Sequence, residues 1–403
     1  MTPPTARALG ALVTGREQSL FQDDLSDSGP ALDEAFSGTR CLVVGGAGSI
    51  GRATLRQLLA FEPSYVHVLD IDENGLVELV RDLRAEGAVP PRTEFRTSTV
   101  DYGSSILRRH LATTEARYDR VLNFAAVKHV RAERDVPSLL HMLDVNVCRM
   151  FDLTQWLGER DCSAYFAVST DKAADPVNLM GASKRAMEHV VLSHPDLSAA
   201  SARFANVAFS AGSLLEGWLN RLRLRQPLPV PRDTRRFLVT AEESGQICLL
   251  ASAVLPRGAV AVPPLMEGDL RLLTDVVGDV LAAHGYEPVL HEDPQEAMAR
   301  LESEARRGRW PVIVTDRDTV GEKEAEKFAT PNDTQIDVPT STLRALRVPV
   351  AQRSEVASTV ADLTRLTRGE GPLPRQQDVV EVLRRLVPEL VHLNEGQNLD
   401  DRQ

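Results

Sequence analysis

Cysteine is scarce in this chain of 403 residues, and its few copies lie far apart. The four cysteines, Cys41, Cys148, Cys162 and Cys248, form no CxxC pair, and the nine histidines form no HExxH pattern. Disulfide frameworks are typical of short, cysteine-rich secreted chains, and cysteine-based zinc sites have paired spacings. We therefore expect neither a disulfide framework nor a bound metal ion.

Long apolar runs are also missing. No stretch approaches the roughly 20 apolar residues that a membrane-spanning helix needs. Charged residues such as Arg7, Arg16 and Asp23 interrupt the first 39 residues, which a secretory signal peptide would not tolerate. We expect a protein without a membrane anchor, in the cytoplasm.

The chain has no excess of positive charge. Lys and Arg total 46 against 57 Asp and Glu, which gives a net charge of −11. A nucleic-acid partner is therefore not expected. An anionic ligand is not excluded, because a few backbone N–H groups can bind phosphates inside an acidic protein.

Short apolar runs alternate with helical patterns from residue 40 onward. Runs bounded by glycine and polar residues, without alternation, are typical of buried parallel strands. Strands and helices in alternation predict an α/β fold, a Rossmann-type doubly wound parallel sheet with helices on both faces. The apolar runs lie at residues 41–44, 65–69, 121–124, 164–168 and 199–204.

The pattern divides the chain into three parts. Residues 1–38 resemble a helical arm, which is either a partly ordered extension or a segment that packs on a partner subunit. Residues 39–225 carry the regular alternation. Residues 226–403 are less regular and predict a smaller C-terminal α/β domain that caps the first, although some of its segments could return to the main sheet.

A glycine pattern follows the first apolar run directly. Gly45, Gly48 and Gly51 lie in the stretch GGAGSIG, which opens a helix. At such positions glycine permits a tight turn, close approach of a pyrophosphate and close packing of helix on strand. Backbone amides at the helix start, including those of Ser49 and Ile50, would face the phosphates. The pattern predicts a dinucleotide site in residues 39–225.

Asp70 ends the second apolar run, 19 residues after Gly51. A carboxylate there accepts hydrogen bonds from a ribose hydroxyl and repels a 2′-phosphate, which favours NAD over NADP. Arg81 and Arg84 lie further along and could serve a 2′-phosphate, so the choice of cofactor stays open.

Two further residues are candidate cofactor contacts. Asp101 follows a predicted strand, at a place where a side chain often hydrogen-bonds the edge of the adenine ring of a dinucleotide. An Asp in that position is also a common turn former or helix cap. Ala125 follows the fourth strand and is placed among the cofactor contacts as well.

Candidate catalytic side chains are most frequent in the stretch VSTDK at 168–172, which is followed by NLMGASK at 178–184. It leaves a buried strand at its carboxyl end, where ligand sites of parallel sheets gather. Thr170 could hydrogen-bond a hydroxyl group, Asp171 could act as an acid and Lys172 as a base. The alternative is a helix-capping Thr-Asp pair beside a solvated lysine.

Together these motifs resemble the extended short-chain dehydrogenase/reductase superfamily, and within it the nucleotide-sugar 4,6-dehydratases of the polysaccharide-biosynthesis group. The resemblance covers about residues 40–400 and points to a branch without a membrane-spanning half. The similar stretches are the glycine motif at 45–51, Lys128-His129, STDK at 169–172, MGASK at 180–184, and residues 203–206, 212–213, 235–237, 318–323 and 388–392.

One position departs from the superfamily, most of whose members have a Tyr four residues before the Lys. Here Met180 precedes Lys184, and a thioether cannot transfer a proton. The same Met occurs in the dehydratase subgroup, so the departure narrows the resemblance. It leaves open which group deprotonates the 4-hydroxyl of the substrate: Asp171, Lys172 or a water molecule held by Thr170.

The resemblance implies NAD-dependent 4,6-dehydration of a nucleotide-activated sugar, such as UDP-N-acetylglucosamine. NAD⁺ would take the C4 hydride, Lys172 would remove the C5 proton, Asp171 would protonate the departing 6-hydroxyl, and the hydride would return to C6. The product would be a 4-keto-6-deoxy sugar.

The resemblance also implies roles for residues outside the STDK segment. Lys184 would bind the nicotinamide ribose. Together with Thr170, Asp171 and Lys172 it forms the set of candidate catalytic residues. Asn146 could support that region or be a structural hydrogen-bonding residue. Arg suits a diphosphate because its planar fork can bind two oxygens, although Arg235 lies next to Arg236. The substrate candidates are Lys128, His129, Met180, Asn206, Ser213 and Arg236.

Other readings remain open. The chain could be a nucleotide-sugar epimerase or oxidoreductase on the same fold, which the Thr-Asp-Lys run disfavours. It could also be an inactive NAD-binding module, for which Met180 is the best argument. A homodimer or higher homo-oligomer is expected from the resemblance, since members of this superfamily often pair helices beside the site.

Overall fold

The computed structural model describes residues 4–113, 117–160, 162–316 and 327–390. The chain forms two compact units, each assembled from segments that are separated in the sequence. The large unit combines residues 21–204, 245–264 and 327–403. The small unit combines residues 1–20, 205–244 and 265–326.

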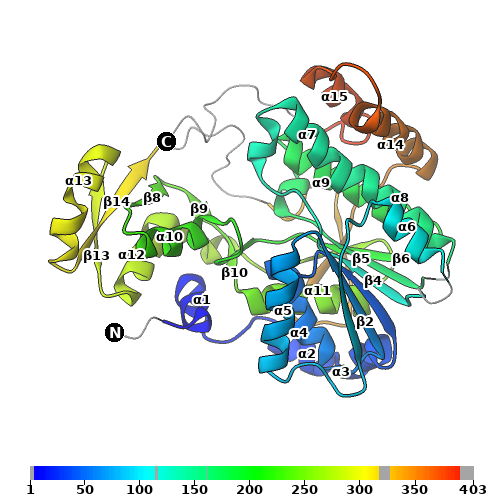
Figure 1. Ribbon diagram of the computed structural model, residues 1–403, viewed down its shortest axis with the longest axis horizontal. Helices are drawn as coiled ribbons and strands as arrows, with labels where there is room; N and C mark the ends of the chain where they lie inside the picture. Colours follow the sequence, from blue (N-terminus) through cyan, green and yellow to red (C-terminus); the bar gives the residue numbers. More distant parts are fainter. Residues whose placement is uncertain (1–3, 114–116, 161, 317–326, 391–403) are drawn as a thin grey trace. The chain divides into compact units, whose positions relative to one another are not determined.

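The large unit contains a nine-stranded sheet within the described residues. Seven neighbouring strands are parallel, and the last two pair in antiparallel fashion at one edge. This confirms the expected doubly wound parallel sheet (Figure 1). The strands, in spatial order, are β3 (Glu94–Thr99), β2 (Tyr65–Asp70), β1 (Arg40–Val44), β4 (Arg120–Asn123), β5 (Ala164–Val168), β6 (Ser198–Ala202), β11 (Ala259–Val262), β16 (Arg344–Arg347) and β15 (Thr334–Ile336).

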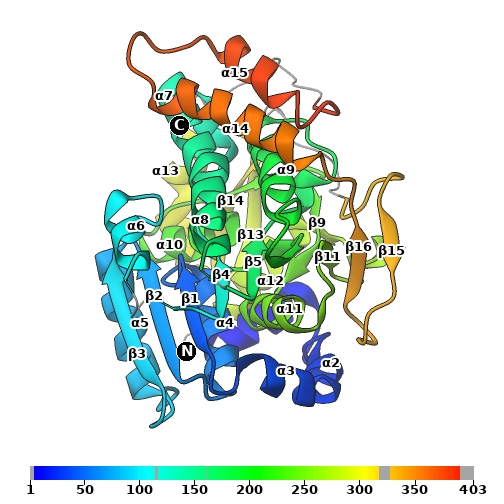
Figure 2. The same ribbon diagram turned by 90° about the vertical axis from the view of Figure 1, so that its right-hand side faces the viewer.

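Burial on both faces explains the unbroken apolar runs of the sequence. Four of five residues in β1 and in β5 are buried, as are five of six in β2. Helices α7, α8 and α9 lie together in Figure 2, with α14 and α15 outside them. The helices of this unit are α2 (Gln22–Asp27), α3 (Gly29–Phe36), α4 (Ser49–Leu59), α5 (Glu73–Ala85), α6 (Ser105–Leu111), α7 (Val136–Leu143), α8 (Arg149–Gly158), α9 (Leu179–Leu192), α14 (Arg353–Arg368) and α15 (Gln376–Leu383), with the short turns η1 (Val130–Glu133), η2 (Asp144–Cys148) and η3 (Asp171–Ala173).

The small unit has its own apolar core. Two fully buried tryptophans, Trp218 and Trp310, pack with Val276, Val280 and Leu301. The indole N–H of Trp218 donates to the carbonyl oxygen of Pro229 at 2.7 Å. Its helices are α1 (Ala6–Thr14), α10 (Leu214–Arg223), α12 (Leu273–Ala283) and α13 (Pro294–Ala305), with the turn η4 (Glu267–Asp269), while α11 (Ala241–Val254) runs from this unit into the other.

Short sheets complete the small unit. A parallel sheet has the order β13 (Glu287–His291), β14 (Arg309–Thr315), β8 (Leu228–Pro231). The remaining strands form two pairs, β7 (Asn206–Val207) with β10 (Leu238–Val239) and β9 (Arg235–Arg236) with β12 (Arg271–Leu272).

The compact units differ from the expected boundaries after residues 38 and 225. The expected arm is split, because α1 belongs to the small unit while α2 and α3 belong to the large one. Arg16 anchors the first segment through a two-pronged ion pair with buried Glu243, at 3.0 and 2.7 Å. Residues 245–264 and 327–403 return to the large unit. Glu243 is 227 residues away from Arg16 in the sequence, so their ion pair leaves no local sequence pattern. The sequence alone therefore could not show which segments form each unit.

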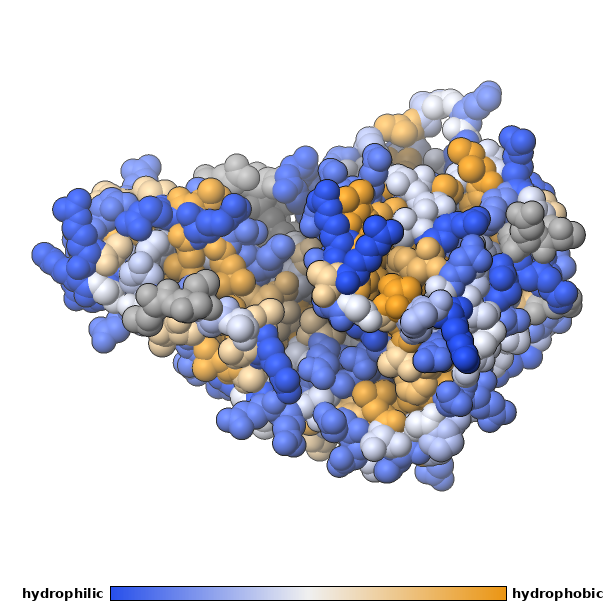
Figure 3. Space-filling model, turned by 60° about the horizontal axis from the view of Figure 1, so that its bottom comes forward, coloured by the Kyte–Doolittle hydropathy of each residue, from blue (hydrophilic) through white to orange (hydrophobic). Residues whose placement is uncertain are grey.

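None of the described helices combines the length and the apolar character needed to cross a bilayer. On the face shown in Figure 3, hydrophilic and apolar side chains are interspersed. Among the described residues, no three His, Cys, Asp or Glu side chains are grouped so that they could hold a metal ion.

Candidate functional site

The glycine turn between β1 and α4 is closed on its inner side. Gly45 has a φ of +73°, and a Cβ there would lie 2.6 Å from the backbone nitrogen of Ala125. A Cβ at Gly51 would lie 2.5 Å from the carbonyl oxygen of Gly45. Both positions therefore require glycine. The turn also lies beside Ala125, just after β4, where the strand order of the sheet reverses direction.

The outer side of the same turn has room. A Cβ at Gly48 would meet only the carbonyl oxygen of Gly45, at 3.4 Å. Gly48 is the N-cap of α4 and provides no side-chain hydrogen bond to the helix. The first-turn amides of an α-helix lack partners within the helix, and here they belong to Ser49, Ile50 and Gly51. The turn can thus admit an anionic group.

Asp70 and Arg52 hold the glycine turn from outside. The Oδ2 atom of Asp70 accepts the amide of Ala47 at 2.9 Å, and its Oδ1 atom accepts the amide of Asp72 at 3.1 Å. The Nε atom of Arg52 donates to the carbonyl oxygen of Ala47 at 2.7 Å, and its Nη2 atom donates to that of Gly75 at 2.7 Å. Side chains thus hydrogen-bond both the backbone amide and the carbonyl oxygen of Ala47. Arg52 was missed from the sequence, because no spacing rule indicates a side chain that turns back onto its own loop.

Asp101 and Ala125 take part in local hydrogen bonds. The Oδ1 atom of Asp101 accepts the amide of Gly103 at 2.9 Å, and its other oxygen pairs with Arg149. That geometry is a turn former with an ion pair. The amide of Ala125 donates to Oδ1 of buried Asn123 at 2.9 Å. The cofactor roles of both residues stay predictions.

Thr170, Asp171 and Lys172 come together directly after β5. The hydroxyl of Thr170 donates to Oδ1 of Asp171 at 2.9 Å, and the Nζ atom of Lys172 lies 3.1 Å from the same oxygen. Asp171 is 3% exposed. Its amide donates to the carbonyl oxygen of Phe204 at 3.1 Å, which fixes the turn against the strand next to β5. A buried carboxylate therefore shares one oxygen between a hydroxyl and an ammonium.

Helix α9 packs closely against this turn. A Cβ at Gly181 would lie 2.6 Å from the carbonyl oxygen of Lys172, so glycine allows the approach. The Oδ1 atom of Asn178 caps the helix by accepting the amide of Gly181 at 2.8 Å. Met180 is 3% exposed. The first turn of α9 and the Thr-Asp-Lys turn thus form one packed substructure.

Lys184 is buried one turn further along α9. Burial lowers its pKa to about 8, against the opposing effect of the Glu188 carboxylate. Among the described residues, its ammonium donates to the sulfur of Met187 at 3.2 Å. A thioether is a weak acceptor, whereas an ammonium has three hydrogens to donate.

Two supporting side chains join the loop after β4 to α9. Glu133 was missed from the sequence; its Oε1 atom accepts the amide of Met180 at 2.7 Å, and burial raises its pKa. Asn146 is fully buried on η2 and forms two hydrogen bonds with the backbone of Val127, each 2.9 Å long. It also donates to the Ser183 hydroxyl at 2.9 Å. Its geometry is that of a structural support for the predicted site.

Lys128 and His129 are exposed in the loop before η1. Partial loss of solvent around the ring, together with the charges of Lys128 and Arg131, lowers the pKa of His129. The neutral imidazole is therefore favoured. Their contact with a sugar stays a prediction.

Three tyrosines of the large unit have hydroxyl groups that are hydrogen-bonded to groups outside the candidate site. The hydroxyl of Tyr102 donates to the carbonyl oxygen of Val145, that of Tyr118 lies 2.7 Å from Nδ1 of His67, and that of Tyr165 accepts from Asn123 at 2.9 Å. Burial raises the pKa of all three. A phenolate base is disfavoured at each of these positions.

The remaining substrate candidates belong to the small unit. Asn206 lies on β7, and its backbone N–H donates to the carbonyl oxygen of Phe237 at 3.0 Å. The hydroxyl of Ser213 caps α10 by accepting the amide of Glu216 at 3.2 Å. Arg236 lies on β9. Their roles stay predictions, and the similar stretch at 318–323 lies outside the described residues.

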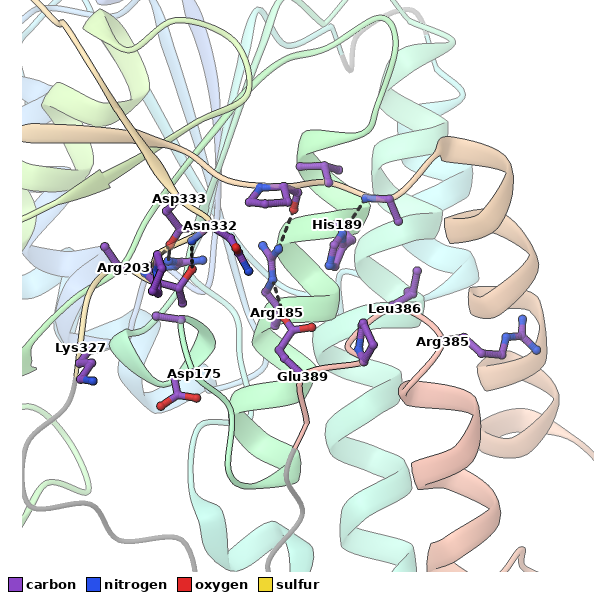
Figure 4. A pocket seen from close by; sticks show the side chains of 18 of the residues that line it. Asp175, Arg185, His189, Arg203, Lys327, Asn332, Asp333, Arg385, Leu386 and Glu389 are labelled. Carbon is purple, nitrogen blue, oxygen red and sulfur yellow. Dashed lines mark hydrogen bonds and ion pairs between the residues drawn. The ribbon is translucent and has the colours of Figure 1, made fainter.

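A pocket of about 680 Å³ in the large unit lies beside α9 and contains none of the predicted site residues (Figure 4). Residues from 327–333, 349–355 and 385–389 line it together with Arg185, His189 and Arg203. Its ion pairs, Arg203 with Asp333 and Arg185 with Glu389, include no residue of the Thr-Asp-Lys turn.

Known proteins similar to this chain include several with named activities. An uncharacterized membrane protein of Methanocaldococcus jannaschii is 29% identical over 61% of this chain and 73% of its own length. The probable polysaccharide biosynthesis protein EpsC of Bacillus subtilis is 25% identical over 69% of this chain. The inverting UDP-N-acetylglucosamine 4,6-dehydratase of Campylobacter jejuni is 24% identical over 57% of this chain and 68% of its own length. The chain spans less than half of EpsC, 47%, and 41% of the capsular polysaccharide protein CapD of Staphylococcus aureus.

Solved structures share the fold. Pen from Bacillus thuringiensis superposes with a TM-score of 0.63 at 19% identity, over 79% of this chain and 90% of its own. The dTDP-glucose 4,6-dehydratase DesIV from Streptomyces venezuelae, solved with NAD bound, superposes with a TM-score of 0.53 at 18% identity, over 86% of this chain and 96% of its own. The family model described as polysaccharide biosynthesis protein matches residues 41–305, and this chain belongs to that family.

Proposed function

We propose that the protein is an NAD-dependent 4,6-dehydratase of a nucleotide-diphosphate sugar, with UDP-N-acetylglucosamine as the first candidate substrate. The observation that carries the proposal is the contact of Lys172 and Thr170 with one oxygen of buried Asp171, at 3.1 and 2.9 Å. Elimination of water needs a base at one carbon and an acid at the next. In this proposal Lys172 is the base and Asp171 is the acid. The named dehydratase among the relatives supports the same reaction class.

The glycine turn fits NAD. Gly48 leaves its outer side open, and the first turn of α4 presents amides suited to a pyrophosphate. Asp70 retains acceptor capacity for a ribose, because each carboxylate oxygen has two lone pairs and accepts one backbone amide. The buried ammonium of Lys184, which has only a sulfur acceptor among the described residues, fits the hydroxyls of the second ribose.

The substitution Gly48→Ala tests that fit. We expect NAD affinity to fall on the order of 10-fold, because the added methyl group occupies the space that the pyrophosphate needs. Stability should change by less than about 1 kcal/mol, since no side chain lies within reach. Titration with NAD and thermal unfolding measure the two effects. Gly29→Ala, at a position with nothing within 4 Å, is the control, and equal NAD affinity in both variants would contradict the placement.

Bound NAD would supply the oxidant for C4 and return the same hydride at C6. The chain's own residues move one net proton, from C5 to the 6-hydroxyl oxygen. Passage of a proton from the Lys172 ammonium to the Asp171 carboxylate leaves a neutral amine beside a carboxylic acid. Lys172 then takes the C5 proton and Asp171 gives its proton to the departing 6-hydroxyl, which leaves as water, so the pair is again an ammonium and a carboxylate. Neither NAD nor the pair is consumed. Three groups are candidates for the 4-hydroxyl base, namely Asp171, Lys172 and a water molecule held by Thr170.

A mass measurement tests the proposed reaction. The purified protein is incubated with UDP-N-acetylglucosamine and no added cofactor, and we expect a product lighter by one water. A product of unchanged mass but altered stereochemistry would instead indicate an epimerase, the activity named for several relatives. Inertness across a panel of nucleotide sugars, with NAD bound, would leave a binding module and overturn both enzymatic readings. A homo-oligomer and a cytoplasmic location remain part of the proposal.

A further inference from the structure

A buried carboxylate joins the two halves of the candidate site. Glu188 lies on α9 and is 0% exposed. Its Oε1 atom accepts the hydroxyl of Ser169 at 2.7 Å. Ser169 directly precedes the Thr-Asp-Lys turn, and Glu188 follows Lys184 by one helical turn. One side chain therefore ties the end of β5 to the helix that carries Met180 and Lys184.

Two arginines hold Glu188 in place. Arg203 donates its Nε and Nη2 atoms to the two carboxylate oxygens at 2.9 and 2.8 Å, and Arg185 adds a bond of 3.0 Å. Burial alone would raise the pKa of Glu188, but Arg203, Arg185 and Ser169 outweigh it and lower the pKa to about 2. The group is ionised at all pH values of interest.

Arg203 continues the network away from the site. Its Nη1 atom donates to Oδ2 of Asp333 at 2.9 Å and to the carbonyl oxygen of Phe328 at 2.9 Å. Figure 4 shows Arg203 with Asp333 on one side of the pocket and Arg185 with Glu389 on the other. Asp333, 3% exposed at its side chain, is thus a second buried carboxylate on the same arginine.

Among the described residues, the carboxylate of Glu188 lies one helical turn after Lys184 on α9 and favours its charged form. Apart from burial, Glu188 is the group that affects the pKa of Lys184, and it raises that pKa. Without it, burial would push the ammonium further toward its neutral form. Other titratable or charged groups on α9 and on the elements packed against it include Arg185 and His189 on α9, Glu133 on η1, Asp144 on η2, Asp171 and Lys172 on η3, Arg149 and Asp152 on α8, Arg203 after β6, Arg353, Glu355 and Asp362 on α14, and Asp378 and Glu381 on α15.

We propose that Glu188 is a positioning residue of the site: through Ser169 it fixes the Thr-Asp-Lys turn against α9, and one helical turn after Lys184 it places a negative charge next to that ammonium. The inference rests on the proposed contact of Lys184 with NAD for its effect on function. It does not depend on that contact for the charge of Lys184 itself.

The chain's few lysines allow a direct test. Only Lys128, Lys172, Lys184, Lys323 and Lys327 occur, so labelling the lysine side chains with ¹³C gives five signals to titrate by NMR. Lys184→Arg identifies the relevant signal. In Glu188→Gln we expect the pKa of Lys184 to fall by about one unit or more. All variants are measured as the full chain, at equal NAD content.

Asp333→Asn is the matched control. It removes another buried carboxylate from Arg203 but none of the groups that act on Lys184. We expect it to reduce stability while the pKa of Lys184 stays unchanged. An unchanged pKa in Glu188→Gln, or an equal fall in Asp333→Asn, would overturn the proposal. Should Glu188→Gln fail to fold, the double change with Arg185→Gln removes one charge of each sign and takes its place.

NAD binding separates this inference from the proposed function. Binding to the protonated ammonium is lost as pH rises through the pKa of Lys184, so the loss should begin at lower pH in Glu188→Gln, by the same shift that NMR records. A lowered pKa without a shifted NAD profile would refute the proposed role of Lys184 at the ribose, while the charge effect of Glu188 would stand.

Discussion

Replacing Lys172 by alanine should lower turnover by about 1,000-fold or more while NAD stays bound. The Nζ atom of Lys172 lies 3.1 Å from Oδ1 of Asp171, so its removal leaves the buried acid without the base that would receive the C5 proton. General acid–base groups contribute roughly 100- to 10,000-fold to enzymatic rates. Product mass over time gives the rate, and absorbance of the dinucleotide released on denaturation gives the NAD content.

Lys327→Ala is the control for loss of a lysine. Lys327 is exposed and lies outside the predicted site, so activity should stay within about 2-fold of the unchanged protein. Full activity in Lys172→Ala would exclude it as the C5 base. Loss of NAD together with activity would instead place Lys172 at the cofactor.

Asp24→Ala should destabilise the large unit by about 3 kcal/mol or more. Asp24 is 0% exposed, and its carboxylate accepts the amides of Ser341, Thr342 and Leu343 at 2.7, 2.9 and 2.6 Å. It also accepts the hydroxyl of Ser341 at 2.8 Å. Alanine leaves the buried amide of Leu343 and the partly buried amides of Ser341 and Thr342 without this acceptor. Urea unfolding followed by tryptophan fluorescence and circular dichroism measures the change.

The neighbouring Asp23→Ala is the matched control. Asp23 is exposed on the same helix, so its loss should change stability by less than about 0.5 kcal/mol. Equal effects of the two substitutions would show that residues 21–36 do not depend on the Asp24 contact. The comparison also tests whether this segment belongs to the large unit or is a free arm.

Much of the candidate site could be proposed from the sequence because its signals are local. The glycine turn, Asp70 at the end of β2 and the Thr-Asp-Lys run each lie within a few residues of a strand end. Strand ends of a parallel sheet meet at one edge, so the structure brings Gly45 beside Ala125 and Lys172 beside Gly181. The absence of tyrosine before Lys184 is likewise written in the sequence.

Other residues could not be found in this way. Arg52, Glu133 and Glu188 are charged residues on helical elements, and solvated side chains have the same sequence appearance. Glu133 and Glu188 have partners outside their own helical elements: Glu133 accepts the amide of Met180, 47 residues away, and Glu188 accepts the hydroxyl of Ser169, 19 residues away. Only the folded chain shows that Glu188 is buried, that Arg52 and Glu133 are partly buried, and that all three are hydrogen-bonded.

The sequence by itself determined the parallel sheet, the glycine turn and the polar residues at strand ends, because apolar runs and turn chemistry act over short distances. The tertiary structure decided which segments form each unit, since buried pairs such as Arg16 with Glu243 and Asp24 with Ser341 join residues 227 and 317 positions apart. It also decided the charge state of the site. Burial lowers the pKa of Lys184, Glu188 opposes that effect, and both depend on packing that no local pattern encodes.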